Sequence, residues 1–228
     1  STRGVMAGGY VTPAANNSMG FITIASQGNE IDFGDLASAT AGILSTGNSQ
    51  RAIWAGGYTP TLLNVIQYVQ IPNGGATVDF GDLTVARQGG SGSSQAHGGL
   101  NDGYQGTRPD PITGQKGLFM GGENPAGMVS QIDLITISVT GNSSDFGDLT
   151  LARGDNPSTG STTRGICGGG NPKTDVIDTI EFSSTGNCSD FGNLTQSRLK
   201  PGAVSNSTRA IFSGGSTPTD VNTIDYIT

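Results

Sequence analysis

One short block of sequence recurs along this chain, and that repetition limits what the chain can fold into. A short apolar run closed by two glycines occurs five times, at Gly8-Gly9, Gly56-Gly57, Gly121-Gly122, Gly169-Gly170 and Gly214-Gly215. The first glycines of these pairs are 48, 65, 48 and 45 residues apart. A fixed period of about 20–50 residues is typical of propellers, solenoids and repeat arrays. The repetition therefore predicts a modular architecture and argues against most enzyme folds.

A second block, Asp-Phe-Gly-Asp/Asn-Leu, follows each of the first four Gly-Gly pairs and begins at Asp32, Asp79, Asp145 and Asp190. We expect its phenylalanines to fill the space between modules, its glycine to allow close backbone packing and its aspartate to cap a turn. These phenylalanines are Phe33, Phe80, Phe146 and Phe191. A basic residue opens each Gly-Gly block, and we predict that it forms an ion pair with a repeated aspartate; these residues are Arg3, Arg51, Lys116, Arg164 and Arg209.

Each repeat contains three clear strand patterns and a weaker fourth. In the third repeat, residues 117–120 are an apolar run, residues 123–128 resemble a loop, residues 132–139 alternate, and residues 145–149 are a short edge-like strand. A polar segment then leads to the next repeat. Four strands per repeat is the content of one propeller blade. No stretch shows helical spacing of apolar residues, which excludes a helical repeat.

The pattern therefore predicts an all-β propeller in one domain. Its five recognisable repeats cover about residues 1–48, 49–114, 115–161, 162–207 and 208–228, with a polar insertion at 88–115. Within the insertion, residues 89–104 lack strand alternation, so we predict that this segment is dispensable for folding. We also predict that the two terminal repeats are incomplete.

The composition indicates a polar, weakly charged surface. Only 13% of the residues are charged, the net charge is −7, and the chain contains 38 glycines. The absence of a Lys/Arg cluster argues against nucleic acid as a partner, and no run of 18 apolar residues predicts a membrane span. Cys167 and Cys188 give no metal-ligand spacing. A disulfide between them is disfavoured, because the repeat pattern places a strand between them.

These motifs resemble kelch repeats, and more closely the divergent kelch-like repeats of tail and virion-associated proteins of marine bacteriophages, cyanophages in particular. The kelch pattern has a Gly-Gly strand, an aromatic-bearing strand, a Trp-x-x-Leu strand and a later arginine. Here phenylalanine takes the tryptophan position, and the resemblance covers nearly the whole chain apart from 88–115. It assigns the aromatic role to Tyr68, Phe182 and Tyr226, and the later arginine to Arg87, Arg153 and Arg198, with Thr40 in the first repeat.

In kelch phasing, the first repeat lacks the strand before its Gly-Gly strand, and the fifth stops before any Asp-Phe-Gly block. A propeller usually closes by combining strands from its two ends, which leaves no sheet edge open. Two expectations stay open: the chain is a fragment of a larger ring or longer protein, or it is a small ring of about five blades with an imperfect closing blade.

The loops after the Gly-Gly pairs are the first candidates for binding, because repeat symmetry places them on one face. Tyr10 and Tyr58 occupy the same repeat position, and a tyrosine beside amide groups suits a sugar ring. The candidate ligand-binding residues on this face are Tyr10, Tyr58, Glu123, Asn124 and Asn171. The alternative is that these are ordinary turn residues.

The polar insertion is the second candidate, through His97 and Tyr104. It is either an exposed loop or a contact loop for a receptor or glycan. Catalysis by His97 is not expected, because no nucleophile or acidic pair accompanies it. The sequence predicts no cofactor and no metal site.

The leading functional hypothesis is a non-enzymatic structural or adhesion module of a phage virion or tail appendage. The resemblance implies a virion (extracellular) location, other virion proteins as partners, and loops presented to a host-surface glycan or receptor. Neither nucleic-acid binding nor membrane insertion is expected. One alternative is a secreted or surface-bound glycan- or protein-binding propeller of cellular origin. The other is a propeller enzyme acting on glycans, which would need a pair of carboxylates outside the repeat pattern.

Overall fold

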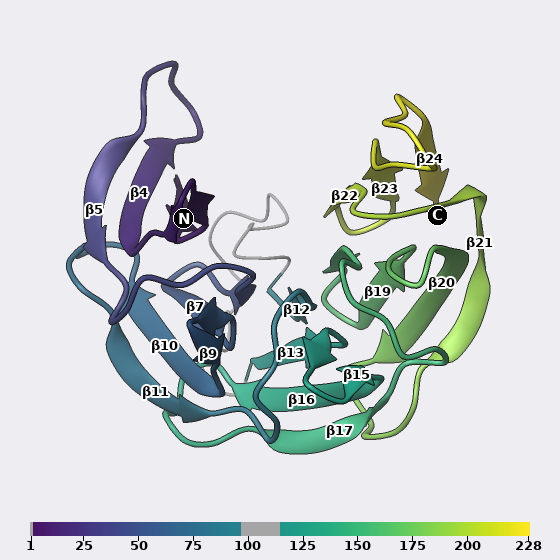
Figure 1. Ribbon diagram of the computed structural model, residues 1–228, viewed down its shortest axis with the longest axis horizontal. Coiled ribbons are helices and arrows are strands. Elements are labelled where there is room, and N and C mark those ends of the chain that lie inside the picture. Colours follow the sequence, from purple (N-terminus) through teal and green to yellow (C-terminus); the bar gives the residue numbers. More distant parts are fainter. Residues whose placement is uncertain (1, 97–114) are drawn as a thin grey trace, which may run out of the picture.

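The protein is an all-β propeller of five blades arranged around a common axis, seen end-on in Figure 1. The computed structural model describes residues 2–96 and 115–228. His97 and Tyr104, two of the predicted contact residues, lie outside the described residues. Within those residues every regular element is a strand, so the predicted fold class is confirmed.

The three central blades are antiparallel sheets of four strands, ordered from the axis outward. The second blade is β6 (Leu44–Gly47), β7 (Arg51–Ala55), β10 (Val65–Gln70) and β11 (Val78–Asp82). The third is β12 (Ser91–Ser94), β13 (Lys116–Met120), β16 (Gln131–Thr136) and β17 (Ser144–Asp148). The fourth is β18 (Ser158–Gly160), β19 (Arg164–Gly168), β20 (Thr174–Glu181) and β21 (Ser189–Arg198).

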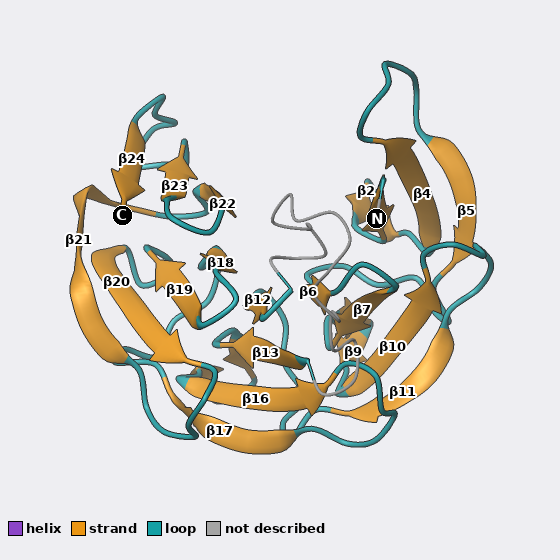
Figure 2. Cartoon of the chain, turned by 180° about the vertical axis from the view of Figure 1, so that it is seen from behind, coloured by secondary structure: helices purple, strands orange, loops and turns teal. Residues whose placement is uncertain are grey.

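The two end blades have three strands each, and they lack opposite ones. The first blade, β1 (Arg3–Ala7), β4 (Ser18–Thr23) and β5 (Ile31–Asp35), has no inner strand. The fifth, β22 (Gly202–Ser205), β23 (Ala210–Ser213) and β24 (Ile224–Ile227), has no outer strand. The predicted phasing is thus confirmed. Figure 2 shows the blades along an open arc, with the end blades facing each other across the opening.

The predicted dispensability of residues 89–104 is wrong for their first half. Ser91–Ser94 form β12, the inner strand of the third blade, with Ser91 opposite Met120. Their side chains satisfy neighbouring backbone instead of filling an apolar core: Ser94 Oγ donates to the Gly47 carbonyl oxygen at 2.7 Å. A strand held by hydroxyl groups carries no apolar alternation, so its sequence resembles a polar loop.

The apolar core lies between blades, and the repeated phenylalanines belong to it. Phe33, Phe80 and Phe146 are 5%, 3% and 2% exposed, as predicted. Phe191 is only half-buried, because the fifth blade has no outer strand to cover it.

The glycine after each of these phenylalanines allows the next blade to approach. At Gly34, a Cβ would lie 2.4 Å from the Gly75 carbonyl oxygen. The Gly75 N–H donates to the Phe33 carbonyl at 2.7 Å, and the same bond recurs from Gly141 to Phe80 at 2.6 Å and from Gly186 to Phe146 at 2.8 Å. The outer rim of each of the first three blades is therefore bonded through backbone to the turn of the next blade.

Three of the four interfaces between blades contain a buried ion pair. Each joins an arginine in or after the outer strand of one blade to an aspartate on the third strand of the next. The N···O distance is 2.8 Å in all three pairs: Arg87–Asp133, Arg153–Asp178 and Arg198–Asp225. The arginines also donate to backbone carbonyls, for example Arg87 to Phe119 at 3.1 Å. Burial lowers the pKa of Arg87, an effect that Asp133 opposes.

The buried ion pairs are formed by other arginines and aspartates than the sequence had predicted. The aspartates that open the Asp-Phe-Gly blocks (Asp32, Asp79, Asp145 and Asp190) are exposed at the outer rim, away from the buried arginines. Asp190 accepts a hydrogen bond from the Gly192 N–H at 2.9 Å, but within β21 and not at the turn that the sequence had predicted.

The basic residues of the Gly-Gly blocks lie mostly over aromatic rings. Arg3 lies 4.6 Å from the Phe21 ring centroid, Arg51 4.6 Å from Tyr68, Lys116 5.7 Å from Phe146, and Arg209 4.7 Å from Tyr226. In the fourth blade, Thr179, and not Phe182, holds the position of Tyr68, since each pairs with the same residue of the Gly-Gly strand. Arg164 accordingly pairs with Glu181 at the surface, at 2.7 Å.

Candidate binding face

The Gly-Gly pairs shape one face of the propeller, which we call the Gly-Gly face. Both glycines of each pair have positive φ, for example 62° at Gly56 and 99° at Gly57. A Cβ at Gly56 would lie 2.3 Å from the Arg87 carbonyl oxygen. The Gly57 N–H donates to that same carbonyl at 2.8 Å. Because only glycine fits this approach, the pair turns each strand out onto the face at a fixed position.

Small hairpins follow the first three Gly-Gly pairs. They are β2 (Tyr10–Val11) with β3 (Ala14–Ala15), β8 (Tyr58–Thr59) with β9 (Thr61–Leu62), and β14 (Glu123–Asn124) with β15 (Gly127–Met128). The predicted loop at 123–128 is thus a hairpin. Two of the predicted binding residues lead their hairpins and are well exposed: 66% for Tyr10 and 46% for Tyr58. The Tyr10 hydroxyl donates to the Pro13 carbonyl at 3.0 Å.

In the fourth blade, Asn171 follows the Gly-Gly pair and is held by backbone pairing. Its N–H donates to the Gly154 carbonyl at 2.7 Å, and its carbonyl accepts from the Gly154 N–H at 2.8 Å. Tyr58 and Glu123 make the same type of bridge, to Ala41 and Gln88. Four of the predicted residues (Tyr10, Tyr58, Glu123 and Asn171) therefore share one repeat position directly after the Gly-Gly pair, and only the tyrosines offer exposed rings. Asn124 is one position later, where its Oδ1 accepts from the Ala126 N–H at 2.9 Å.

A backbone chain around the axis is a feature that sequence reasoning missed. We call Gly42, Gly89, Asp155 and Lys200 the axial chain. Each N–H donates to the carbonyl of the preceding member: Gly89 to Gly42 at 2.8 Å, Asp155 to Gly89 at 2.6 Å, and Lys200 to Asp155 at 3.2 Å. All four φ values are positive, at 65°, 67°, 50° and 50°. The repeat pattern does mark these residues, since each one comes two residues after the arginine or Thr40 of its repeat.

Charged side chains gather at this end of the axis. A cavity of about 240 Å³ is lined by Glu123, Asp155 and Lys200, together with Gln88 and Met128. Lys200 Nζ lies 3.6 Å from Asp155 Oδ2, and Gln88 Nε2 donates to Glu123 Oε1 at 2.6 Å. Asp155 and Lys200 adopt a backbone conformation that ordinary residues rarely take. Glu123 therefore lies beside an ion pair near the axis, a juxtaposition that its sequence position did not reveal.

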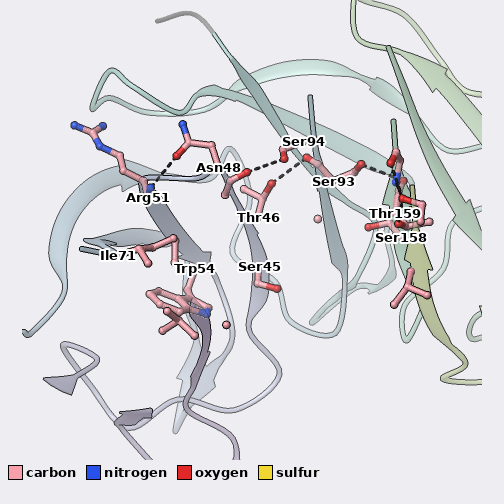
Figure 3. Close-up of a pocket in the computed structure, with 18 of the residues that line it drawn as sticks. Ser45, Thr46, Asn48, Arg51, Trp54, Ile71, Ser93, Ser94, Ser158 and Thr159 are labelled. Carbon is pink, nitrogen blue, oxygen red and sulfur yellow. Dashed lines mark hydrogen bonds between the residues drawn. The ribbon is translucent and has the colours of Figure 1, made fainter. Parts of the chain in front are cut away.

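The axis also contains a cavity of about 390 Å³, lined by the inner strands (Figure 3). Hydroxyl groups link these strands: Thr46 Oγ1 donates to the Ser93 carbonyl at 3.0 Å, and Ser93 Oγ donates to the Thr159 carbonyl at 3.1 Å. Trp54 lies at its edge with Arg51 (Figure 3). The described residues of the lining offer neutral donors and acceptors with two arginines, Arg3 and Arg51, and none of these described residues carries a carboxylate.

The surroundings of the two cysteines disfavour the thiolate form. Both are free thiols, Cys167 buried and Cys188 partly so. Burial raises the pKa of both thiols, which lowers the thiolate fraction that nucleophilic attack needs. Across residues 2–96 and 115–228, no three His, Cys, Asp or Glu side chains are grouped to hold a metal ion.

No protein-family model and no curated protein matches this chain. Among the residues with described positions, no helix is long and apolar enough to span a membrane. The structure thus establishes a β-propeller whose Gly-Gly face carries short hairpins with exposed side chains.

Proposed function

We propose that this protein is a non-enzymatic binding module that presents the Gly-Gly face to a surface glycan. The observation that carries the proposal is the placement of two exposed tyrosines, Tyr10 and Tyr58, at the same position of consecutive hairpins. Tyrosine rings offer an apolar face with a polar edge, which suits the alternating surface of a sugar. The acidic net charge of −7 favours neutral polar ligands over polyanions.

The scaffold supports this role, because it holds the hairpins rigidly. The Gly-Gly turns are bonded to the arginine-bearing links at 2.8–3.0 Å, for example Gly57 to Arg87 and Gly170 to Arg198. Binding loops on a rigid frame lose little conformational entropy when a ligand binds. The cavity of Glu123, Asp155 and Lys200 lies on the same face and adds charged hydrogen-bonding groups for a polar substituent.

The wider setting follows from the kelch-like resemblance, which favours a virion or tail-associated protein of a phage that contacts other virion proteins and a host surface. Each contact through one or two tyrosines would be weak. Many copies on one particle would raise the overall avidity through effective concentration. A secreted or surface propeller of cellular origin would use the same face.

The test is a glycan array read with the intact protein and two double variants. Tyr10→Ala/Tyr58→Ala should lose binding, because the stacking surfaces are removed. Tyr10→Phe/Tyr58→Phe is the matched control and should keep most of it, because the rings remain. Equal binding by all three proteins would eliminate the tyrosines as the contact.

A second measurement tests the non-enzymatic part of the proposal. Glu123 and Asp155 line one cavity, and a glycosidase needs two carboxylates at a suitable separation. We expect no release of reducing ends from bound glycans. If reducing ends are released, and Glu123→Gln abolishes that release, the protein is an enzyme and not a non-enzymatic binding module.

A further inference from the structure

The four members of the axial chain share one backbone conformation but differ in residue type. Glycine holds the first two positions, Gly42 and Gly89, and a charged residue holds the last two, Asp155 and Lys200. Their φ values are 65°, 67°, 50° and 50°. Because glycine adopts positive φ without a steric penalty, the backbone of the axial chain does not require the side chains of Asp155 and Lys200.

These two charged residues stand at their positions at the expense of backbone conformation. Lysine rarely adopts positive φ, and aspartate tolerates it better. Such outliers are typical of positions where a side chain has a use beyond folding. The ion pair between the two residues is not a sufficient use, because Lys200 Nζ lies 3.6 Å from Asp155 Oδ2 and the Lys200 side chain is 70% exposed. Exposed pairs of this kind contribute little to stability.

The two glycine members keep space open beside the charged ones. A Cβ on Gly42 would lie 3.2 Å from Gln88 Oε1, and a Cβ on Gly89 would lie 3.8 Å from Asp155 Oδ1. A longer side chain at either position would enter the space that these polar groups border. The glycines thus preserve the cavity of about 240 Å³ that Glu123, Asp155 and Lys200 help to line. We call this cavity the axial pocket.

The axial pocket offers more hydrogen-bond acceptors than donors. Glu123 Oε1 accepts from Gln88 Nε2 at 2.6 Å. Within residues 2–96 and 115–228, Glu123 Oε2 and both carboxylate oxygens of Asp155 accept no hydrogen bond. An ionised carboxylate can only accept hydrogen bonds. The matching ligand therefore brings several donors close together, as adjacent hydroxyl groups do.

Tyr58 lies next to the residues that line the axial pocket. Its N–H donates to the Ala41 carbonyl at 2.9 Å, and Ala41 directly precedes Gly42. Glu123 holds the same repeat position in the next blade, where it pairs with the residue before Gly89. An exposed aromatic ring and a carboxylate of the pocket thus come from equivalent positions of neighbouring blades.

We propose that the axial pocket binds one neutral sugar unit, whose adjacent hydroxyl groups donate to the carboxylates of Asp155 and Glu123. This inference rests on the proposed glycan-binding function and adds a second contact, so that the tyrosines contact the units beyond the pocket. A volume of about 240 Å³ is below the ~300–1,000 Å³ of sites for drug-sized molecules, which limits the pocket to a single ring. Two carboxylates against one ammonium group disfavour an anionic sugar.

Free sugars test the pocket directly, through NMR of the isotope-labelled protein. The probes are the methyl glycosides of glucose, galactose and mannose, and the uronic acid forms of the same sugars. At least one neutral glycoside should shift the amide signals of Gly89 and Asp155 at millimolar concentration. The matching uronic acid should bind several-fold more weakly, because it brings a carboxylate to a pocket with net negative charge.

Asp155→Gly is the sharpest variant, because it installs the residue that the first two members of the axial chain already have. It should raise the urea midpoint of unfolding slightly and weaken sugar binding at least several-fold. Lys200→Gly should raise the midpoint further, because lysine tolerates positive φ less well. Asp79→Asn removes a carboxylate at the exposed outer rim and should leave the binding unchanged. Gained stability with lost binding is the expected behaviour of a functional side chain.

Three outcomes would overturn the inference: unshifted pocket amides with all three neutral glycosides, undiminished sugar binding by Asp155→Gly, or a preference for the uronic acids. The glycan array separates this inference from the proposed function. Array binding that needs Tyr10 and Tyr58 but not Asp155 would retain the proposed function and reject the axial pocket. Sugar-dependent shifts in the pocket without any array binding would retain the pocket and reject a surface glycan as the ligand.

Discussion

The interface between the first two blades buries neutral polar side chains where the three later interfaces bury ion pairs. The later interfaces bury Arg87–Asp133, Arg153–Asp178 and Arg198–Asp225. At the first interface the arginine position is Thr40, which is 0% exposed, and the aspartate position is Gln67, which is 4% exposed. Gln67 Oε1 accepts from the Ala37 N–H at 3.0 Å and from Thr77 Oγ1 at 2.6 Å.

The two charges of each buried ion pair act as one unit. Both charges are absent together at the first interface, and the blades still pack around Trp54 and Val69. A buried charge without its partner is strongly unfavourable, whereas a neutral replacement of both partners is tolerated. The pair is therefore one way of filling the interface and not a requirement of the fold.

The largest expected effect comes from breaking one pair. Arg153→Ala leaves Asp178 buried without a cation, and the free energy of unfolding should fall by about 3–5 kcal/mol. Urea unfolding monitored by circular dichroism measures this loss. A loss below about 1 kcal/mol, the size typical of an exposed pair, would show that Asp178 is not stranded.

Removing an interface phenylalanine compares a covered blade with an uncovered one. Phe146→Ala should destabilise by about 3 kcal/mol, as for a buried aromatic side chain. Phe191→Ala should cost about half as much, because Phe191 is only half-buried beside the incomplete fifth blade. Thermal and urea unfolding give both values. Equal losses would mean that the fifth blade covers Phe191 as fully as the others are covered.

Placing the residues of the first interface at the third interface should recover part of the stability lost when Arg153 alone is replaced. Arg153→Thr/Asp178→Gln reproduces the Thr40 and Gln67 combination at the third interface. It should be more stable than Arg153→Thr alone by about 1–3 kcal/mol, because neither charge is then buried unpaired. The four proteins of the double-mutant cycle provide the measurement. A double variant as unstable as the sum of its single changes would argue that the two positions are independent.

The two cysteines report on the third interface, because both pack in its cluster. Burial raises the pKa of each thiol, so at mildly alkaline pH the folded protein should react slowly with a thiol reagent. Arg153→Ala should speed this labelling, since it weakens the surrounding interface. Thr40→Val, two interfaces away, should leave the labelling rate unchanged. Acceleration by both substitutions would indicate that the propeller opens as a whole.

The smallest effect is expected at the first interface itself. Thr40→Val keeps the shape of the side chain but removes the hydroxyl that donates to the Ser38 carbonyl at 2.9 Å. The loss should be about 1 kcal/mol, the net value of one hydrogen bond. Urea unfolding resolves such a change, and a loss as large as that of Arg153→Ala would remove the distinction between the interfaces.

The propeller, its repeat phasing and the interface phenylalanines were all predictable from the sequence. These features depend on local patterns: apolar strands, glycine turns and a fixed period, all of which are visible along one chain. The exposed tyrosines after Gly9 and Gly57 also followed from repeat position, although their ligand stays a proposal.

Which charges meet, which polar segment is a strand and what surrounds the axis depend on contacts between residues far apart in the sequence. Arg153 and Asp178 lie on different blades, so no local pattern pairs them. Ser91–Ser94 form a strand by backbone pairing with β13, which follows the polar insertion in the sequence, and the Ser94 hydroxyl donates to the Gly47 carbonyl of the neighbouring blade. The axial chain is made by backbone N–H and carbonyl groups, which every residue carries, so side-chain identity could not reveal it.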